Sequence, residues 1–379
     1  MITKFNNSLA AMLPRSRLVG PREREARRGR PYRFQLGANE SLFGPSPKAL
    51  ATLLSRGSSV NSYCDPTHSD LRSAIASSWG QTNSNVAVGE GVEGLLEICA
   101  RAFLNKGDVV ITTRGTYPTL SYYVNNSDAK MVFQPYTYDR QVDLVGIAAV
   151  ARRQKARMVY VVNPDNPTGS FLTATMLLKL LDDLPEGCVL LLDEAYAEYA
   201  PPGSLLDRSV EKHNLVRLRS FSKIYGLAGA RIGYAVAHES IISFLERIRQ
   251  RYGVSKLSQE MAVSAFFDDE FVNDTREKTL EGLAHYAEIA REVGALTLPS
   301  KANFLTFDFG SRFLADWVTD CCEKNDVLVM RPDDPLLDRC VRVTVAPLEA
   351  RVFLRSVLSE AVGTAPDLNE QLRVGNGSA

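Results

Sequence analysis

Lys223 has neighbours that favour chemistry with an aldehyde that also bears a phosphate. Two serines, Ser220 and Ser222, precede the lysine, and Arg231 follows it by eight positions. A lysine amine condenses with a carbonyl group, whereas hydroxyls and a guanidinium are suitable donors for a phosphate dianion. These residue types therefore predict a binding site for a small phosphorylated aldehyde.

Two upstream segments add further polar groups: the Asn163–Gly169 run (NPDNPTG) and the Asp193–Tyr196 run (DEAY). Asn166, Asp193 and Lys223 each follow, or lie close to, the end of an expected strand. Ligands of doubly wound sheets bind beyond the carboxyl ends of the strands. Alone, Lys223 would be a solvated lysine and Asp193 a turn residue, but three complementary groups at such ends favour one shared site.

The combination resembles the fold-type-I enzymes that use pyridoxal 5'-phosphate (PLP), specifically the histidinol-phosphate aminotransferase branch. The Leu218–Gly229 segment is similar to the lysine segment of that branch, and the motifs keep the same order from about Leu36 to Arg342. PLP presents one aldehyde, one phosphate, one ring nitrogen and one phenolic oxygen, and the chain has a partner for each. The resemblance implies an α/β fold with a mostly parallel sheet, helices on both faces, and a smaller α+β C-terminal domain.

The resemblance also implies roles around the cofactor ring. Lys223 would bond to the aldehyde and then transfer a proton, and Asp193 would keep the ring nitrogen protonated. Asn166 and Tyr196 would hydrogen-bond to the phenolic oxygen. Tyr117 matches the aromatic residue that stacks on the ring, although a half-buried structural aromatic is an equal interpretation from the sequence alone.

For the phosphate, the resemblance implies Ser220, Ser222 and Arg231, together with backbone groups of Gly91-Val92-Glu93. The last three residues open an expected helix, where free N–H groups and the helix dipole favour an anion. The family usually has a small residue and Asp in place of Val92-Glu93, so one side-chain hydroxyl is lost here. Tyr63 matches a tyrosine that reaches the phosphate of the neighbouring subunit, which implies a homodimer with shared active sites.

Substrate binding is implied for Arg342, within a strand-like segment near the C-terminus, and for Arg331 and Asn39. By itself Arg342 could equally be an exposed edge-strand residue. The chain departs from the family at Pro14-Arg15 and at Ala346-Pro347. These changes leave histidinol phosphate, an aromatic or other amino acid, and a specialised biosynthetic substrate all open.

Another motif favours a different class of enzyme. Residues 89–94 (GEGVEG) match the glycine fingerprint of dinucleotide-binding proteins, and Asp108 lies near the position of the ribose-binding acid. However, Asp108 precedes the expected strand Val109–Thr112, whereas that fingerprint needs the acid at the strand's carboxyl end. The phosphate cradle is common to both interpretations, and the rest of the site favours PLP.

The predicted function is a PLP-dependent aminotransferase, which moves an amino group between an amino donor and an oxo acceptor. A PLP decarboxylase similar to threonine-phosphate decarboxylases remains an alternative, because one electron sink serves both reactions. A non-catalytic PLP-binding protein is a further alternative, which the intact set of Lys223, Asp193 and Arg231 disfavours.

Apolar runs of strand length alternate with helical patterns from residue 86. The runs Met158–Val162 and Val189–Leu192 are continuously apolar, which is typical of parallel strands covered on both faces. We expect an N-terminal arm over residues 1–45, a large PLP-binding domain over 46–245, a small domain over 246–362, and a flexible tail over 363–379.

The composition is that of an ordinary globular protein. The chain has 379 residues, 45% of them hydrophobic, and a formal net charge of zero, which gives no general reason to expect a nucleic-acid partner. Seven arginines lie within residues 15–30, which we interpret as a solvated or partner-crossing segment. Six cysteines without CxxC spacing, four histidines, and the lack of a signal peptide or an apolar span predict a cytoplasmic, non-membrane protein without a metal site.

Overall fold

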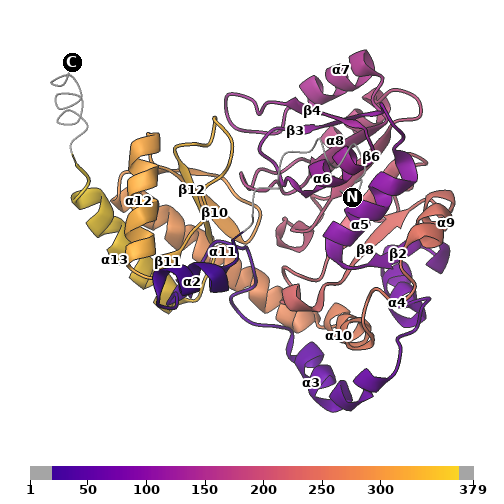
Figure 1. Ribbon diagram of the computed structural model, residues 1–379, viewed down its shortest axis with the longest axis horizontal. Coiled ribbons are helices and arrows are strands. Elements are labelled where there is room, and N and C mark those ends of the chain that lie inside the picture. The colour runs from indigo at the N-terminus through magenta and orange to yellow at the C-terminus, as the bar shows by residue number, and fades with distance from the viewer. Residues whose placement is uncertain (1–18, 367–379) are drawn as a thin grey trace, which may run out of the picture. The chain divides into compact units, whose positions relative to one another are not determined.

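The computed structural model describes residues 19–366, which form two compact units (Figure 1). The described part of the first unit comprises residues 40–280 and 299–303, and that of the second comprises residues 19–39, 281–298 and 304–366. The division into an arm, two domains and a tail stays a prediction. Pro14-Arg15 and most of the expected tail lie outside the described residues.

A seven-stranded sheet forms the centre of the first unit (Figure 1). In spatial order its strands are β2 (Val86–Gly89), β8 (Gly233–Ala237), β7 (Leu215–Ser220), β6 (Val189–Asp193), β5 (Met158–Val162), β3 (Val109–Thr113) and β4 (Lys130–Gln134). Strands β7, β6, β5, β3 and β4 are parallel, and β8 is antiparallel to both β2 and β7. The prediction of a mostly parallel sheet is confirmed.

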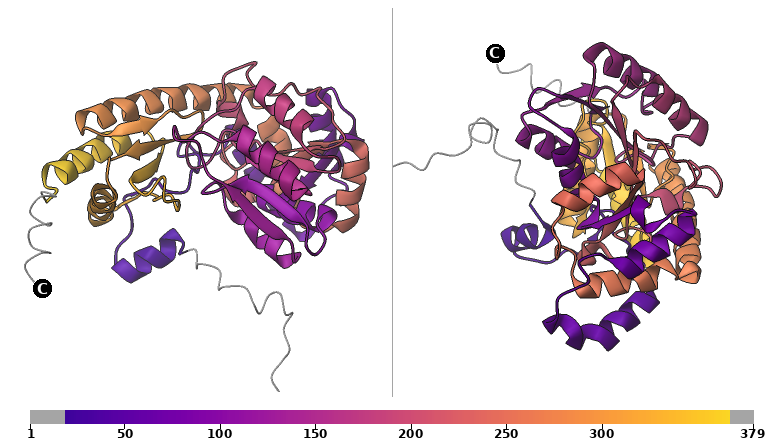
Figure 2. Two further views of the ribbon diagram at one scale, coloured as in Figure 1. Left: turned by 90° about the horizontal axis from the view of Figure 1, so that it is seen from above. Right: turned by 90° about the vertical axis from the view of Figure 1, so that its right-hand side faces the viewer.

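Continuous apolar sequence explains the central strands. Every residue of β5, β6, β7 and β8 is buried, so both faces of the sheet are covered. The helices of this unit are α3 (Pro47–Arg56), α4 (Ser69–Trp79), α5 (Gly91–Phe103), α6 (Thr119–Asn126), α7 (Leu144–Gln154), α8 (Ala174–Asp183), α9 (Glu239–Ile248) and α10 (Lys256–Phe266). Figure 2 gives two further views of them. Hydroxyl caps start several of these helices; the Thr173 side chain, for example, accepts a hydrogen bond from the Met176 N–H at the start of α8.

The strand register gathers several chain segments at one edge of this sheet. Asp193, the last residue of β6, is level with Val162 of β5 and Leu218 of β7. On the other side of β7, Ser220 is level with Gly233 of β8. Because parallel strands end at the same edge, the loops that follow β3, β5, β6 and β7 all emerge there.

The second unit contains a three-stranded antiparallel sheet. Its strands are β9 (Leu296–Leu298), β10 (Phe304–Asp308) in the middle and β12 (Cys340–Thr344), and a separate parallel pair joins β1 (Phe34–Gln35) to β11 (Val327–Leu328). Its helices are α2 (Pro21–Arg28), α12 (Arg312–Lys324) and α13 (Leu348–Gly363). Helix α11 (Asp269–Glu292) contributes residues to both units. No helix in the described part of the chain has the length and apolar composition that a bilayer span requires.

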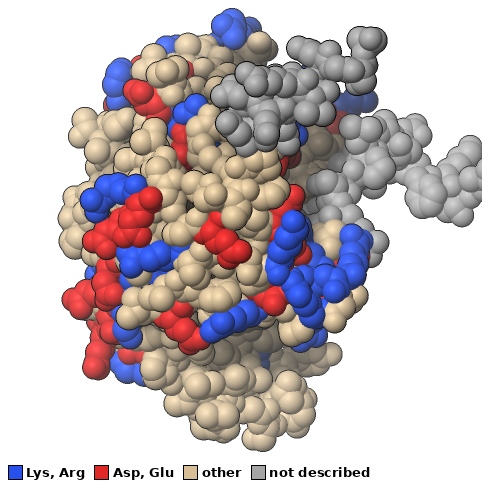
Figure 3. All heavy atoms as spheres, turned by 90° about the vertical axis from the view of Figure 1, so that its left-hand side faces the viewer, with Lys and Arg blue, Asp and Glu red and all other residues tan. Residues whose placement is uncertain are grey.

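The arginines of α2 are accompanied by acidic side chains. Arg27 pairs with Glu23 at 2.7 Å, and Arg28 pairs with Asp326. Figure 3 shows basic and acidic side chains interleaved over one face of the molecule. These two arginines of α2 are therefore each neutralised by an acidic neighbour.

A buried ion cluster lies on the face of the sheet opposite to Asp193. Glu194 accepts hydrogen bonds from Arg217 at 2.9 and 3.0 Å and from Arg219 at 3.0 Å. Arg219 also pairs with Glu198 at 2.9 Å, and the Arg217 guanidinium lies 4.5 Å from the centroid of the Trp79 ring. Burial alone would raise the pKa of Glu194, but the two arginines lower it overall. Glu194 therefore stays ionised and neutralises arginines that have no access to water.

Replacing Glu194 by alanine should destabilise the protein strongly. The substitution leaves two buried arginines without their shared carboxylate, a loss that typically costs about 3–5 kcal/mol. Urea denaturation would measure the change in the free energy of unfolding. The matched control is Lys179→Ala, which removes the surface pair of Lys179 with Asp183 and should cost about 0.5 kcal/mol or less. Equal effects of the two substitutions would contradict the assigned importance of the buried cluster.

Candidate active site

Asp193 lies at the centre of the sheet's carboxyl edge and is 2% exposed. Its Oδ2 accepts a hydrogen bond from the Tyr160 hydroxyl at 2.8 Å, and its Oδ1 accepts one from the Ala195 N–H at 3.0 Å. Burial raises the pKa of Asp193 to about 6, although both hydrogen bonds and the charge of Lys223 oppose the shift. A carboxylate held in this way favours a cationic partner, such as a protonated pyridine nitrogen.

Lys223 lies in the turn that follows β7, and Tyr196 lies just after β6. The Nζ atom of Lys223 is 5.4 Å from the centroid of the Tyr196 ring. Lys223 also acts electrostatically on Asp193, so the amine, the phenol and the carboxylate belong to one site. The structure thus brings together the three residues that the sequence predicted to be catalytic.

Asp165 fixes the loop that carries Asn166. Its buried carboxylate accepts hydrogen bonds from the hydroxyls of Thr116 at 2.6 Å, Tyr136 at 2.9 Å and Thr168 at 2.6 Å. Thr116 also contacts the Asn166 carbonyl at 3.4 Å. Asp165 therefore joins the loop after β3 to the loop after β5. The peptide bonds before Pro164 and Pro167 are both cis.

Tyr117 follows Thr116 and is held in the same place. Burial raises the pKa of its phenol, and the carboxylates of Glu93 and Asp193 add to the shift, whereas a hydrogen bond with Thr119 opposes it. Tyr117 is therefore within electrostatic range of both Asp193 and the start of α5. This position agrees with the expected aromatic contact to a cofactor ring, which stays a prediction.

Gly91 and Arg231 form an anion cradle at the start of α5. Gly91 has a φ of +72°, and a Cβ added there would lie 2.9 Å from Nη2 of Arg231. A Cβ added at Gly233 would lie 3.2 Å from the Cα of Gly91, so β8 approaches the same turn. The first N–H groups of a helix have no partner within it. A guanidinium against such N–H groups fits a phosphate dianion.

Two serines accompany this cradle. Ser220 is the last residue of β7, and its hydroxyl accepts a hydrogen bond from the Ser222 N–H at 3.0 Å. Both serines are buried, and Arg231 itself is exposed with a φ of +51°. The residues present therefore fit PLP: donors for its phosphate, an acid for its ring nitrogen, and an amine for its aldehyde.

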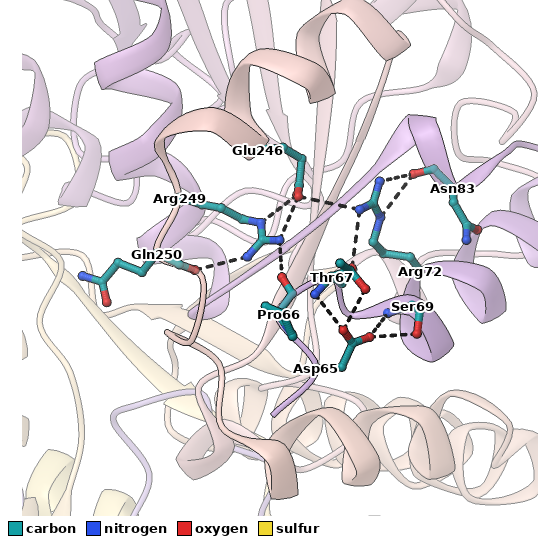
Figure 4. A network of polar contacts seen from close by, with 9 residues as sticks. All are labelled: Asp65, Pro66, Thr67, Ser69, Arg72, Asn83, Glu246, Arg249 and Gln250. Atoms are coloured by element: carbon teal, nitrogen blue, oxygen red, sulfur yellow. Dashed lines mark hydrogen bonds and ion pairs between the residues drawn. The ribbon is translucent and has the colours of Figure 1, made fainter. Parts of the chain in front are cut away.

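Tyr63 has a different environment, because its side chain is 84% exposed and contacts the Tyr252 ring at a centroid distance of 4.9 Å. The segment that follows it is fixed by a polar network (Figure 4).

In this network, Asp65 accepts hydrogen bonds from the N–H groups of Thr67 and Ser69, at 2.9 and 2.6 Å. In the same network, Arg249 donates to the Pro66 carbonyl at 2.6 Å and pairs with Glu246 at 2.8 Å. The exposed Tyr63 ring is therefore attached to a segment whose backbone is fixed by hydrogen bonds.

The three predicted substrate residues belong to the second unit. Arg342 is 4% exposed, donates to the Gly37 carbonyl and lies over the Phe304 ring, so it is not an exposed edge-strand residue. The Asn39 backbone N–H donates to the Thr344 hydroxyl at 3.0 Å. The role of these residues in substrate binding stays a prediction.

Arg331 pairs with Asp316 at 3.2 Å and also donates to the Asp338 carbonyl. Its buried Nε and Nη1 atoms have no hydrogen-bond partner among the described residues. Burial lowers the pKa of this guanidinium.

The sequence did not single out Tyr160, Asp165 or Thr116 as site residues. Tyr160 lies inside a continuously buried strand, where an aromatic residue is typical of a core. Only the register of β5 against β6 brings its hydroxyl to Asp193.

Comparison with known proteins identifies the family. The model for aminotransferase class I and II matches residues 33–353. The chain belongs to this family. It is 35% identical over 361 residues to a histidinol-phosphate aminotransferase of Roseiflexus castenholzii, covering 93% of this chain and 96% of the relative. A second such enzyme, from Carboxydothermus hydrogenoformans, is 36% identical over 331 residues, covering 85% and 90% of the two chains.

Solved structures agree with this assignment. The crystal structure of a Sinorhizobium meliloti histidinol-phosphate aminotransferase in complex with PLP superposes with a TM-score of 0.92 at 34% identity, covering 97% of this chain and 99% of that one. A Thermus thermophilus aspartate aminotransferase shares the fold, with a TM-score of 0.81 at 18% identity over 95% of this chain. The protein is a PLP-dependent aminotransferase, and the predictions of enzyme class, cofactor and family are confirmed.

A side chain at Gly91 should weaken PLP binding. Gly91→Ala places a Cβ against the Arg231 guanidinium and should displace it from the phosphate. Loss of one hydrogen bond to a charged group corresponds to about 10–100-fold in the Kd for PLP. Titration of the apoprotein with PLP, followed by cofactor absorbance, would measure the Kd.

The matched control is Gly80→Ala. Gly80 also has a positive φ, +62°, but a Cβ there would meet no atom within 4 Å. This control variant should carry the strain of an alanine at positive φ but keep the wild-type Kd for PLP. Equal Kd values for the two variants would contradict the cradle at Gly91.

Proposed function

We propose that this aminotransferase exchanges an amino group between an amino acid and its 2-oxo acid on one side and a phosphorylated amine of the histidinol-phosphate type on the other. The observation that supports this substrate class is Arg331. Its two buried N–H-bearing nitrogens lack partners among the described residues, and an anion would supply the missing acceptors. The names of the relatives support the same choice.

An aromatic or other amino acid remains the second candidate for the amino donor. Arg342, buried and already oriented by the Gly37 carbonyl, is suited to the single carboxylate of such a substrate. The similarity to aminotransferases favours amino transfer over decarboxylation.

When bound, PLP supplies an aldehyde that accepts the amino group and a ring that withdraws electrons from the substrate carbon. In this proposal, the Lys223 amine would hold the cofactor at its aldehyde and would carry a proton at Nζ. The Tyr196 ring and the charge of the Asp193 carboxylate act on this amine and would keep it in position. Asp193 would pair with the ring nitrogen, while Asn166 and Tyr196 would donate to the phenolic oxygen. The phosphate would be bound by Ser220, Ser222, Arg231 and the backbone of Gly91–Glu93.

The active unit in this proposal is a homodimer. Tyr63 supports it, because a large aromatic side chain exposed on an anchored segment is suited to reach a partner subunit. Its hydroxyl would contact the phosphate in the neighbouring site. A cytoplasmic location likewise stays a prediction.

The two arginines should differ in how they depend on the donor. Arg342→Ala should lower kcat/KM for every donor, because each presents an anion, by the several tens-fold or more that corresponds to about 2–5 kcal/mol. Arg331→Ala should lower kcat/KM strongly for histidinol phosphate and only slightly for an aromatic amino acid. Steady-state kinetics of both variants on both donors would measure this.

The control for these variants is Arg312→Ala, which removes an exposed arginine of α12 whose ion pair with Asp316 is 3.6 Å long. It should change neither donor's kcat/KM by more than about twofold. Small and equal effects of Arg331→Ala and Arg342→Ala on all donors would show that the anion binds elsewhere.

Mixed dimers should reveal a shared site. Lys223→Ala subunits lack the essential amine, and Tyr63→Phe subunits lack the hydroxyl donated to the partner. A heterodimer of the two would have one site without either lesion, so the mixture should be more active than both parents. Co-expression with two affinity tags, followed by activity assays, would test this. A mixture no more active than its parents would contradict sharing, and an active Lys223→Ala homodimer would contradict the role of Lys223.

A further inference from the structure

Tyr160 stands out among the buried polar groups that the proposed function has not used. It lies on β5, is 1% exposed, and its hydroxyl is 2.8 Å from Oδ2 of Asp193. In the parallel register Tyr160 is level with Leu191 and Val162 with Asp193. Because side chains alternate along a strand, Tyr160 points to the same face as Val162, and therefore to the same face as Asp193. Tyr160 lies two residues before the level of Asp193, and its long side chain spans that distance.

The phenol is a permanent donor. Burial raises the pKa of Tyr160 well above 10, and the charge of Asp193 adds to the shift, so the hydroxyl keeps its proton throughout the physiological range. With Tyr160 on Oδ2 and the Ala195 N–H on Oδ1, each oxygen of Asp193 has a fixed hydrogen-bond donor. The orientation of the carboxylate is therefore set before any ligand binds.

The same hydrogen bond also affects the charge of Asp193. Burial raises the pKa of this carboxyl to about 6, and the Tyr160 hydrogen bond opposes that rise more than any other contact. Among the described residues, the charges of Lys223 after β7 and of Glu194, the next residue in the chain, also act on Asp193, and Asp193 acts on the phenol of Tyr117 after β3. The Tyr160 hydroxyl donates a hydrogen bond directly to the carboxylate.

We propose that Tyr160 is a positioning residue that keeps the Asp193 carboxylate ionised and oriented toward the cofactor's ring nitrogen. This inference rests on the proposed pairing of Asp193 with that nitrogen. A hydroxyl that stabilises the carboxylate makes it a weaker base, so the shared proton stays on the ring. Without it, the carboxylate would be more basic and would draw the proton toward itself.

The test compares the pH dependence of PLP binding to wild-type and Tyr160→Phe apoprotein. Affinity that depends on ionised Asp193 falls as the pH drops through the pKa of that group. Removing the hydroxyl raises this pKa, so the loss of affinity should begin at a higher pH, and the Kd at pH 7 should rise by about tenfold or more. In the loaded protein, ¹⁵N NMR of labelled PLP should show a ring nitrogen that is less protonated than in the wild type.

The matched control is Tyr234→Phe. Tyr234 is a buried tyrosine of the same sheet, level with Arg219 and therefore on the face opposite to Asp193, where it packs against Trp79. This variant should lose a similar amount of stability but keep the wild-type pH profile and ¹⁵N shift. The inference is wrong if Tyr160→Phe keeps the wild-type profile, or if Tyr234→Phe shifts it equally.

A second variant keeps the test valid if Tyr160→Phe does not fold. Incorporation of 3,5-difluorotyrosine at position 160 retains the shape and makes the phenol a stronger donor, so the loss of affinity should move to a lower pH. No movement, or movement upward, would overturn the inference. Wild-type apoprotein that did not bind PLP at any pH would instead overturn the proposed function, and this inference with it.

Discussion

The cost of burying a carboxylate at the end of an apolar strand constrains the rest of the site. Strand β6 is continuously buried, and Asp193 ends it without reaching water. Such a group either takes up a proton or finds partners. The structure supplies Tyr160, the Ala195 N–H and the charge of Lys223, which together moderate the effect of burial without cancelling it. Burial still disfavours the ionised form of Asp193, and the positive charge of a protonated cofactor ring would stabilise that form.

Glu194, the residue after Asp193, lies on the other face of the same sheet, and its charge is stabilised by arginines within the protein. Glu194 is as deeply buried as Asp193, but two arginines neutralise it fully. One face therefore holds a closed ion cluster that contributes to stability, while the other keeps a carboxylate available for a ligand. Asp193 at the end of β6 and Glu194 directly after it can be used in this way because successive side chains of extended backbone point to opposite faces.

Local sequence was sufficient to predict much of the fold. The run Met158–Val162 forms β5 with the predicted bounds, and β6 extends one residue beyond the prediction, to Asp193. Strand β3 likewise extends one residue beyond the expected Val109–Thr112, to Thr113. The antiparallel direction of β8 and the strand order were not predicted, because they depend on pairing between segments far apart in the chain.

The same distinction applies to the site. Lys223, Asp193 and Tyr196 were predicted because they belong to short motifs with complementary chemistry, and the fold brings them together. Tyr160 and Asp165 were missed for different reasons. A tyrosine in a buried strand is indistinguishable from a core aromatic by sequence, and Asp165 acts through hydroxyls that belong to other loops.

The hydrogen bonds of Asp165 have a further consequence for the entropy of cofactor binding. A single buried carboxylate ties the loop of Tyr117 to the loop of Asn166, so neither loop can change its conformation independently of the other. These two loops therefore lose their conformational entropy when the protein folds. Cofactor binding does not have to order them again, so it loses less entropy. Affinity gained in this way requires no additional contact with the ligand.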